Sequence, residues 1–286
     1  MIFYAVFGIF PFLFTFYVSL TNWDVLRGTN EFVGLANYAA LFTTDIRFVR
    51  SILNTLFFMA VSIPVMLGLG LLIAYTLHRD NGRLRRFLQT ATFLPYVTIP
   101  VAIGFMFAVF FDKDIGVMNS LLLKLGWVKD GVNWLGDPWY ARLVVSLMII
   151  WKNTGYSLVI LMAGFASIPR EIYEAAHMDG AGFFRLFSSV ALPMLRPVIL
   201  FLTVTMIIGG FQLFDEAMVL FQGFNATTVV GGPERCCITA VWHLYDTAFA
   251  TTTNYGHASA IAYGLFVIIA VFSLLAMKAV NRGESA

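Results

Sequence analysis

Charged residues are scarce in this sequence. Only 12% of its 286 residues are Asp, Glu, Lys or Arg, and the formal net charge at pH 7 is +2. Binding to nucleic acid depends on basic side chains gathered along the phosphate backbone, and the chain has no dense basic tract. The sequence therefore excludes nucleic acid as a partner.

Cysteine and histidine are also rare. The two cysteines, Cys236 and Cys237, are adjacent, which is neither a disulfide framework nor the spacing of metal ligands. We expect two small side chains that tolerate an apolar setting. The histidines are scattered over loops expected on both sides of the chain's apolar segments, and no Ser/His/Asp or two-carboxylate arrangement is indicated. We predict no enzymatic activity, no metal and no cofactor; the histidines are His78, His177, His243 and His257.

Apolar residues, in contrast, are abundant. They make up 59% of the chain, which includes 29 Phe, and the mean hydropathy is +0.82. A soluble domain of this length cannot bury so much apolar surface. The composition predicts a protein that resides in a lipid bilayer.

Six segments are long and apolar enough to cross the ~30 Å hydrocarbon core of a bilayer. Pro64 lies inside the second segment, and Pro95 and Pro100 are placed to kink the third or delay its first turns. We predict an all-α polytopic membrane protein with a single domain, 1–286, whose helices span about 2–20, 54–77, 93–111, 143–165, 198–221 and 258–277.

The orientation follows from a short basic connection after the second segment. Arg79, Arg83, Arg85 and Arg86 crowd into it, and the positive-inside rule assigns such a loop to the cytoplasm. By parity the polar segment 168–197 is cytoplasmic, and six crossings place both termini there.

Segment 168–197, IPREIYEAAHMDGAGFFRLFSSVALPMLRP, is a polar, charge-bearing stretch between long apolar segments. Glu171 and Glu174 would lie in the first turns of a helix, where carboxylates complement the helix dipole. Gly180 can adopt the left-handed conformation that ends a helix. This pattern predicts a short helix over Arg170–Asp179.

A second amphipathic piece, Phe183–Leu192, follows that helix and offers Phe184, Phe187 and Leu192 to a groove. Ala175, Ala176 and Ala181 are small enough to let a partner surface approach the backbone. An ordinary interhelical loop is the alternative that composition alone leaves open.

The letters EAAHMDGAGFFRLFSSVALPMLRP resemble the cytoplasmic EAA loop of the membrane subunits of binding-protein-dependent ABC importers. Other stretches resemble the sugar-importing branch, of maltose and glycerol-phosphate type: SLTNWD, FVGLANYAALF, WKNTGYSLVILMAGFASIP and FQLFDEAMVL. The first two are more similar to the first of the two membrane subunits. The resemblance implies the type I ABC importer permease fold and a multi-pass location in the cell membrane.

The resemblance further implies a permease subunit that forms half of a sugar translocation pathway. Its partners would be a second homologous permease, two ATP-binding cassette ATPase subunits and an extracytoplasmic solute-binding protein. The chain has no G-x-x-x-x-G-K-[ST] motif, which fits a nucleotide site on another subunit. Carried over by position, the residues that couple to the ATPase are Glu174, Ala175, Ala176, Asp179 and Gly180.

Three features depart from the family pattern. Residues 223–230, GFNATTVV, lengthen a link that is usually short. His257 stands where the family usually has Tyr, and Cys236 and Cys237 replace small hydroxyl residues. None of these changes lies in the EAA loop.

Polar groups within the predicted spans are costly and so are functional candidates. The resemblance implies that the fourth and fifth helices line the sugar site. The candidate substrate-path residues are Lys152, Asn153, Tyr156, Gly209, Gly210, Gln212 and Asp215.

Two alternatives stay open for these residues. Lys152 and Asp215 can instead form a structural ion pair, and Gly209 and Gly210 can serve helix packing. The alternative function is an ion-gradient-driven secondary transporter or channel, which would use Lys152, Asp215 and Glu216 as its relay. The specific sugar is not encoded in any of these patterns.

Overall fold

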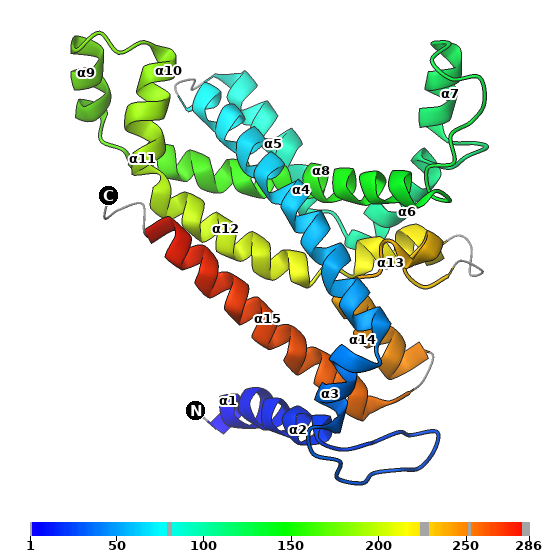
Figure 1. Cartoon of the computed structure of the whole chain (residues 1–286). Coiled ribbons are helices and arrows are strands. Elements are labelled where there is room, and N and C mark those ends of the chain that lie inside the picture. The colour runs from blue at the N-terminus through cyan, green and yellow to red at the C-terminus, as the bar shows by residue number, and fades with distance from the viewer. Residues whose placement is uncertain (1, 79–81, 224–228, 251–252, 282–286) are drawn as a thin grey trace. The chain divides into compact units, whose positions relative to one another are not determined.

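The computed structural model describes residues 2–78, 82–223, 229–250 and 253–281. These ranges are helical and contain no β-strand, and only isolated bridges join Thr21 to Phe32 and Asp24 to Thr29 and Asn254. The helices are shown in Figure 1. The all-α prediction is confirmed.

Figure 1 colours the helices in chain order, from blue at the N-terminus to red at the C-terminus. Three π-helical segments, Ala5–Ile9, Phe187–Ala191 and Asp246–Ala250, and a 3₁₀ turn, Pro233–Arg235, complete the described elements. The α-helices are α1 (Ile2–Tyr4), α2 (Phe10–Ser19), α3 (Ala36–Thr43), α4 (Ile46–Leu77), α5 (Arg83–Val97), α6 (Pro100–Phe110), α7 (Val117–Lys124), α8 (Pro138–Ser167), α9 (Arg170–Met178), α10 (Phe183–Leu186), α11 (Leu192–Met194), α12 (Arg196–Phe211), α13 (Asp215–Gln222), α14 (Ala240–Tyr245) and α15 (Tyr255–Asn281).

Several of these helices are long and apolar enough to cross a membrane. Among the described residues, four stretches qualify: α4, α8, Arg196–Gln222 and Tyr255–Lys278. The pair α5 and α6 qualifies as a fifth, bent by 98° at its break. The first apolar helix is shorter, at Ala5–Ser19. A helical, multi-pass architecture is therefore present, and the count of six crossings stays a prediction.

The helix that contains the second predicted span is longer than that span. The span is predicted to begin near Asn54, whereas α4 begins at Ile46. The added turns are tied down by tertiary contacts, because Phe48 is buried and the guanidinium of Arg47 lies 3.4 Å from the carboxylate of Asp246. Hydropathy alone does not report such contacts.

The third and fifth spans were predicted as single helices, and both are broken. The third begins at Arg83 rather than Phe93 and breaks before Pro100, which has no N–H to continue the hydrogen-bond ladder. The predicted proline kink is thus confirmed. The fifth breaks after Phe211, where Phe214 leaves helical geometry with φ −147° and ψ −69°. Arg79, which belongs to the predicted basic connection, lies outside the described residues. So do residues 224–228, which belong to the lengthened link after the fifth predicted span.

Contacts divide the chain into two compact units. Unit 1 comprises Met1–Phe58, Gly104–Val144 and Gly209–Phe272. In it, Leu41 and Phe48 pack with Ala260 and Ile261 of α15, and the ring of Phe12 packs against that of Tyr263 at 5.3 Å. The first apolar helix is therefore fixed against α15 through aromatic contacts.

Unit 2 comprises Met59–Ile103, Val145–Ile208 and Ser273–Ala286. Its core joins α4, α8, α10 and α12, and its fully buried side chains include Leu158, Leu161 and Leu202. Tyr75 of α4 donates a hydrogen bond of 2.8 Å to the carbonyl oxygen of Phe183. The polar segment after α8 is thereby attached to the helical core of its own unit.

At Gly155, two helices of unit 2 approach each other closely. A Cβ built there would lie 2.1 Å from the carbonyl oxygen of Thr92 and 2.7 Å from the Cα of Phe93. Both are backbone atoms of α5, so no change of rotamer could make room. The absence of a side chain at Gly155 is what lets α8 and α5 pack together.

Candidate functional site

Helix α9 has the position that its sequence predicts. It runs from Arg170 to Met178, with Pro169 before it and Asp179 as its C-cap. Gly180 has φ +75° and donates to the carbonyl oxygen of His177 at 3.0 Å, while Ala181 donates to that of Ala176 at 2.9 Å. This pair of bonds is the Schellman motif, which glycine favours. The predicted helix and its glycine terminator are confirmed.

The two sides of α9 have different surroundings. Ile172, Tyr173 and Ala176 pack against the core of unit 2. Ala175 and Met178 are exposed, and Met178 leaves 89% of its surface accessible. Figure 1 shows α9 and α10 beyond the end of α8. Helix α9 is therefore anchored on one side and presents the other for contact.

The segment after α9 is a second helical piece, as predicted. Helix α10, a π-helical turn and α11 follow without interruption from Phe183 to Met194. Leu186 and Ala191 are buried, whereas Phe184 is 83% exposed. The predicted amphipathic character is confirmed, and Phe184 joins Met178 as an exposed apolar side chain in the EAA loop. Phe187 and Leu192 are instead half-buried, and Phe187 packs against the core of unit 2.

The five EAA-loop residues do not share one environment. Ala175, Asp179 and Gly180 are exposed, Glu174 is exposed and also lines a cavity, and Ala176 packs against the core. Our sequence reasoning missed Met178, although its spacing of three from Ala175 already placed the two on one helical face.

Candidate residues of the substrate path on α8 belong to unit 2. The side-chain amide of Asn153 donates to the carbonyl oxygen of Ile149 at 2.8 Å. The ring of Tyr156 stacks on that of Tyr96 with centroids 5.0 Å apart. Lys152 is half-buried beside them in sequence. These three side chains thus combine hydrogen-bonding groups with an aromatic pair.

The remaining candidates belong to unit 1. Gly209 and Gly210 are in the last turn of α12, Gln212 is in the break, and Asp215 begins α13. A Cβ at Gly209 would meet no atom within 4 Å, so among the described residues no close packing explains this glycine. The ion pair between Lys152 and Asp215 stays a prediction.

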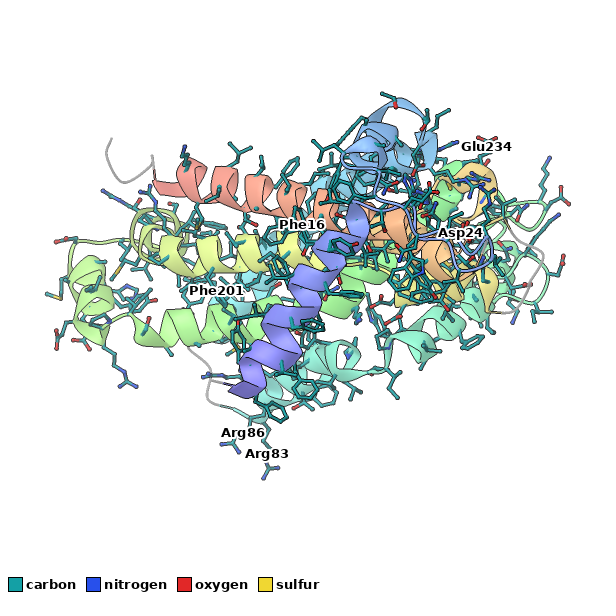
Figure 2. All side chains as sticks on the ribbon, turned by 90° about the horizontal axis from the view of Figure 1, so that it is seen from below. Phe16, Asp24, Arg83, Arg86, Phe201 and Glu234 are labelled. Carbon is teal, nitrogen blue, oxygen red and sulfur yellow. The ribbon has the colours of Figure 1, made fainter. Side chains whose placement is uncertain are left out.

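The arginines at the start of α5 differ in their exposure to solvent. Arg83 and Arg86 are exposed, and Figure 2 shows their side chains extending away from the ribbon. Arg85, between them in sequence, is half-buried and lines the same cavity as Glu174. One residue of this basic connection therefore faces inward.

Unit 1 contains a polar cluster that the sequence reasoning missed. The Nε2 atoms of His243 and His257 lie 2.7 Å and 2.8 Å from Oδ2 of Asp45. The interpretation that these two histidines are scattered was therefore wrong. They are 198 and 212 residues from Asp45 in sequence, and no local pattern reports such a distant pairing.

The adjacent cysteines behave as expected. Cys236 and Cys237 are both buried and unbridged, with their sulfur atoms 3.4 Å apart. Burial raises the pKa of the Cys237 thiol, which keeps it protonated. The prediction of two small side chains in an apolar setting is confirmed.

Asp45→Asn should lower the stability of the protein by about 2 kcal/mol at neutral pH, because it weakens charge-assisted hydrogen bonds to two histidines. Burial acts to raise the pKa of Asp45, but the bonds from His243, His257 and the Phe48 N–H outweigh it and hold that pKa well below its usual range. This stabilisation is present above the unfolded-state pKa of about 3.9 and is lost as the pH falls toward the folded-state pKa.

Thermal unfolding of the purified protein between pH 3 and pH 7 measures this effect. The gap between wild type and variant should be constant near neutral pH and should shrink below about pH 4. Asp130→Asn, at an exposed position, is the matched control and should unfold like the wild type. A gap that persists unchanged at the lowest pH would contradict the assignment.

Comparison with known proteins supplies a family. Residues 33–282 match the family described as binding-protein-dependent transport system inner membrane component. The lactose transport system permease protein LacF of Rhizobium radiobacter is 33% identical over 279 residues, 97% of this chain and 90% of the relative. The arabinooligosaccharides transport system permease protein AraP of Bacillus subtilis (strain 168) is 31% identical over 96% of this chain and 84% of the relative.

A solved structure is similar along nearly the whole chain. It is described as the crystal structure of a bacterial ABC transporter involved in the import of the acidic polysaccharide alginate. The TM-score is 0.81 at 23% sequence identity, covering 98% of this chain and 92% of the solved one. At this level of identity the likeness establishes the fold.

Proposed function

We propose a transport mechanism from one premise: this chain belongs to the family of binding-protein-dependent transport system inner membrane components. It is a multi-pass permease subunit of the inner membrane and a transport component rather than an enzyme. Family membership favours an ABC importer over the ion-gradient-driven transporter or channel that the residues alone left open.

A di- or oligosaccharide is the substrate class that we propose. The named relatives include permeases for lactose and arabinooligosaccharides and the diacetylchitobiose uptake permease NgcF of Streptomyces coelicolor (strain ATCC BAA-471 / A3(2) / M145), which is 30% identical over 98% of this chain. All three names describe sugars of at least two units. The chain would form half of the pathway, with a second permease and an extracytoplasmic binding protein that delivers the sugar.

The sugar path is proposed to include the polar groups of α8 and of the broken α12 and α13. Asn153 and Tyr156 would supply an amide and an aromatic face, the combination that suits a sugar ring. Gly209 would let a sugar approach the backbone, since a Cβ there would meet no atom within 4 Å. Lys152, Gly210, Gln212 and Asp215 complete the proposed set.

Coupling to a separate ATPase is proposed to occur through α9. The observation that carries this proposal is the two-sided setting of α9. The helix packs against the core of unit 2 through Ile172 and Ala176, ends before Gly180 in its left-handed conformation, and leaves Met178 89% exposed on the other side. A helix held on one side transmits a push as a rigid body, whereas a mobile loop would absorb it. This assignment places α9 and both termini in the cytoplasm.

A cysteine cross-link tests the docking of α9. In the complex purified with its ATPase, Met178→Cys should form a covalent adduct with the ATPase through a short bifunctional maleimide. The native Cys236 and Cys237 are 1% and 0% exposed, so they should add no background. Leu26→Cys, at a 77% exposed position in a loop predicted on the opposite side, is the control.

An adduct with Met178→Cys alone supports the proposal. If Leu26→Cys forms the adduct instead, the loop that holds Leu26 faces the ATPase, and the proposed orientation of the chain in the membrane is wrong. If neither variant reacts with the ATPase while both react with a soluble maleimide, α9 is not the docking element.

A further inference from the structure

An apolar surface lies on the segment that joins α6 to α8 within unit 1. The segment contains α7, and large apolar side chains are exposed on the helix and on both of its flanks. So many exposed apolar side chains on so short a segment indicate a contact surface rather than a solvated loop. Those that leave between 45% and 75% of their surface accessible are Ile115, Val117, Leu121, Leu123, Leu125 and Trp127.

The polar side chains of α7 are separated from the apolar ones. Ser120 and Lys124 are exposed and four residues apart, so they share one side of the helix. Asn119, the third polar residue of α7, is turned inward and is only 2% exposed. Helix α7 is therefore amphipathic, with one polar side and apolar residues around most of the remaining circumference.

Asn119 attaches α7 to the chain that returns toward α8. Its side-chain amide donates to the carbonyl oxygens of Lys113 and Val132, each at 2.9 Å. Its side-chain oxygen accepts from the N–H of Val132 at 3.1 Å and from the indole N–H of Trp134 at 2.9 Å. A folded element, rather than a loose loop, thus presents the apolar surface.

Trp134 in turn attaches this element to the ends of two helices. Its ring packs against that of Phe111 with centroids 5.6 Å apart and against that of Tyr140 at 5.3 Å. Phe111 directly follows α6 and Tyr140 is in the first turn of α8, and both helices belong to stretches that qualify as membrane spans. Residues 111–116, which separate α6 from α7, can extend over at most about 22 Å. The boundary between lipid and water at the end of a span is therefore within reach of α7.

The residues of the segment suit that boundary. Trp127 and Trp139 are exposed, and tryptophan is enriched where lipid headgroups meet hydrocarbon. Lysine can lay its methylene stem along an apolar surface while its ammonium group stays among the headgroups. The exposed charged side chains have mixed signs, so burial of apolar surface rather than charge selects the partner; they are Lys113, Asp114, Lys124, Lys129 and Asp130.

We infer that α7 is an interfacial helix, whose apolar residues lie in the boundary region of the lipid bilayer and whose Ser120 and Lys124 face water. The hydrogen bonds of Asn119 and the ring contacts of Trp134 would then fix the depth at which α8 enters the bilayer. This inference depends on neither the proposed sugar path nor the proposed coupling to an ATPase.

Spin labels at neighbouring positions of α7 test this location in the full-length chain, reconstituted into phosphatidylcholine nanodiscs. Leu121→Cys is the test and Ser120→Cys is the matched control, and Cys236 and Cys237 should take up no label because they are buried. Collisions of each nitroxide with oxygen, which concentrates in lipid, are compared with its collisions with a nickel chelate, which stays in water. The oxygen-to-nickel ratio should be at least about 5-fold higher at Leu121→Cys than at Ser120→Cys, because only position 121 faces the apolar region.

Val117→Cys checks that the result follows the helix rather than one side chain. Val117 is four residues before Leu121 and on the same side of α7, so its label should give the same high ratio. Circular dichroism and size-exclusion profiles establish that each labelled chain is folded. Equal ratios at positions 117, 120 and 121 would overturn the inference, since α7 would then have no side that faces lipid.

The same labels in the assembled transporter distinguish lipid from a protein partner. We expect the ratios to be unchanged when the second permease, the ATPase and the binding protein are present. A label at position 121 that becomes inaccessible to both oxygen and nickel on assembly would assign the surface to a contact between subunits and would overturn the inference. The measurement on the chain alone involves no sugar and no ATPase, so its failure is distinct from a failure of the proposed function.

Discussion

Gly180→Val should lower substrate-stimulated ATP hydrolysis by the assembled transporter by at least about 10-fold. Gly180 has φ +75°, and a left-handed backbone costs an ordinary L-residue about 1–2 kcal/mol, with β-branched residues disfavoured most. Valine would release the end of α9 from its Schellman hydrogen bonds. The residues of α9 would be unchanged, but the end of the helix would no longer be held in the geometry that coupling needs.

Gly182→Val is the matched control for this prediction. Gly180 and Gly182 are both exposed, and a Cβ at either would meet nothing within 4 Å. They differ in backbone conformation, since Gly182 has φ −72°. Gly182→Val should therefore hydrolyse ATP near the wild-type rate. Equal losses in the two variants would mean that bulk in the loop, rather than the end of α9, determines coupling.

Gly155→Ala should lower the stability of the permease by about 2–3 kcal/mol, because overpacking forces the backbone to move. The added Cβ would lie 2.1 Å from the carbonyl oxygen of Thr92, so α8 and α5 would have to separate. Alanine is the better helix former by about 1 kcal/mol, but this gain is smaller than the cost of the clash. Thermal unfolding in detergent and the yield of monodisperse protein measure the change.

Gly68→Ala is the control for the same substitution in a membrane-spanning helix. Gly68 lies within α4, and a Cβ there would meet nothing within 4 Å. It should unfold at the wild-type temperature or slightly above it. If Gly155→Ala behaves in the same way, the close packing of α8 on α5 is not required for folding.

Local sequence signals account for much of the fold. Apolar length placed α8 and α15 within a few residues, because burial in a bilayer acts on every residue of a span. The end of α9 at Met178 followed from a local signal, the glycine at position 180 just after the helix. In contrast, the early start of α4 depends on Arg47 and Asp246, which are about 200 residues apart. Contacts of that kind have no local pattern.

The candidate site likewise has features that local sequence predicts and features that depend on long-range contacts. Helical spacing alone puts Arg170, Glu174 and His177 on one face of α9. Nothing in the sequence around them indicates that Arg85 lines the same cavity as Glu174, because the fold of unit 2 brings α5 there. The resemblance to importer permeases supplied the coupling role, and the structure added which side of α9 is exposed.

ATP dependence of sugar uptake is the most direct test of the central claim, that this chain couples import to ATP hydrolysis on a partner. The measurement uses vesicles that contain the chain with its second permease, its ATPase and its binding protein. We predict that uptake of a di- or oligosaccharide requires ATP on the side of the ATPase and persists when an uncoupler is added. Uptake that continues without ATP and collapses with the uncoupler would contradict the claim.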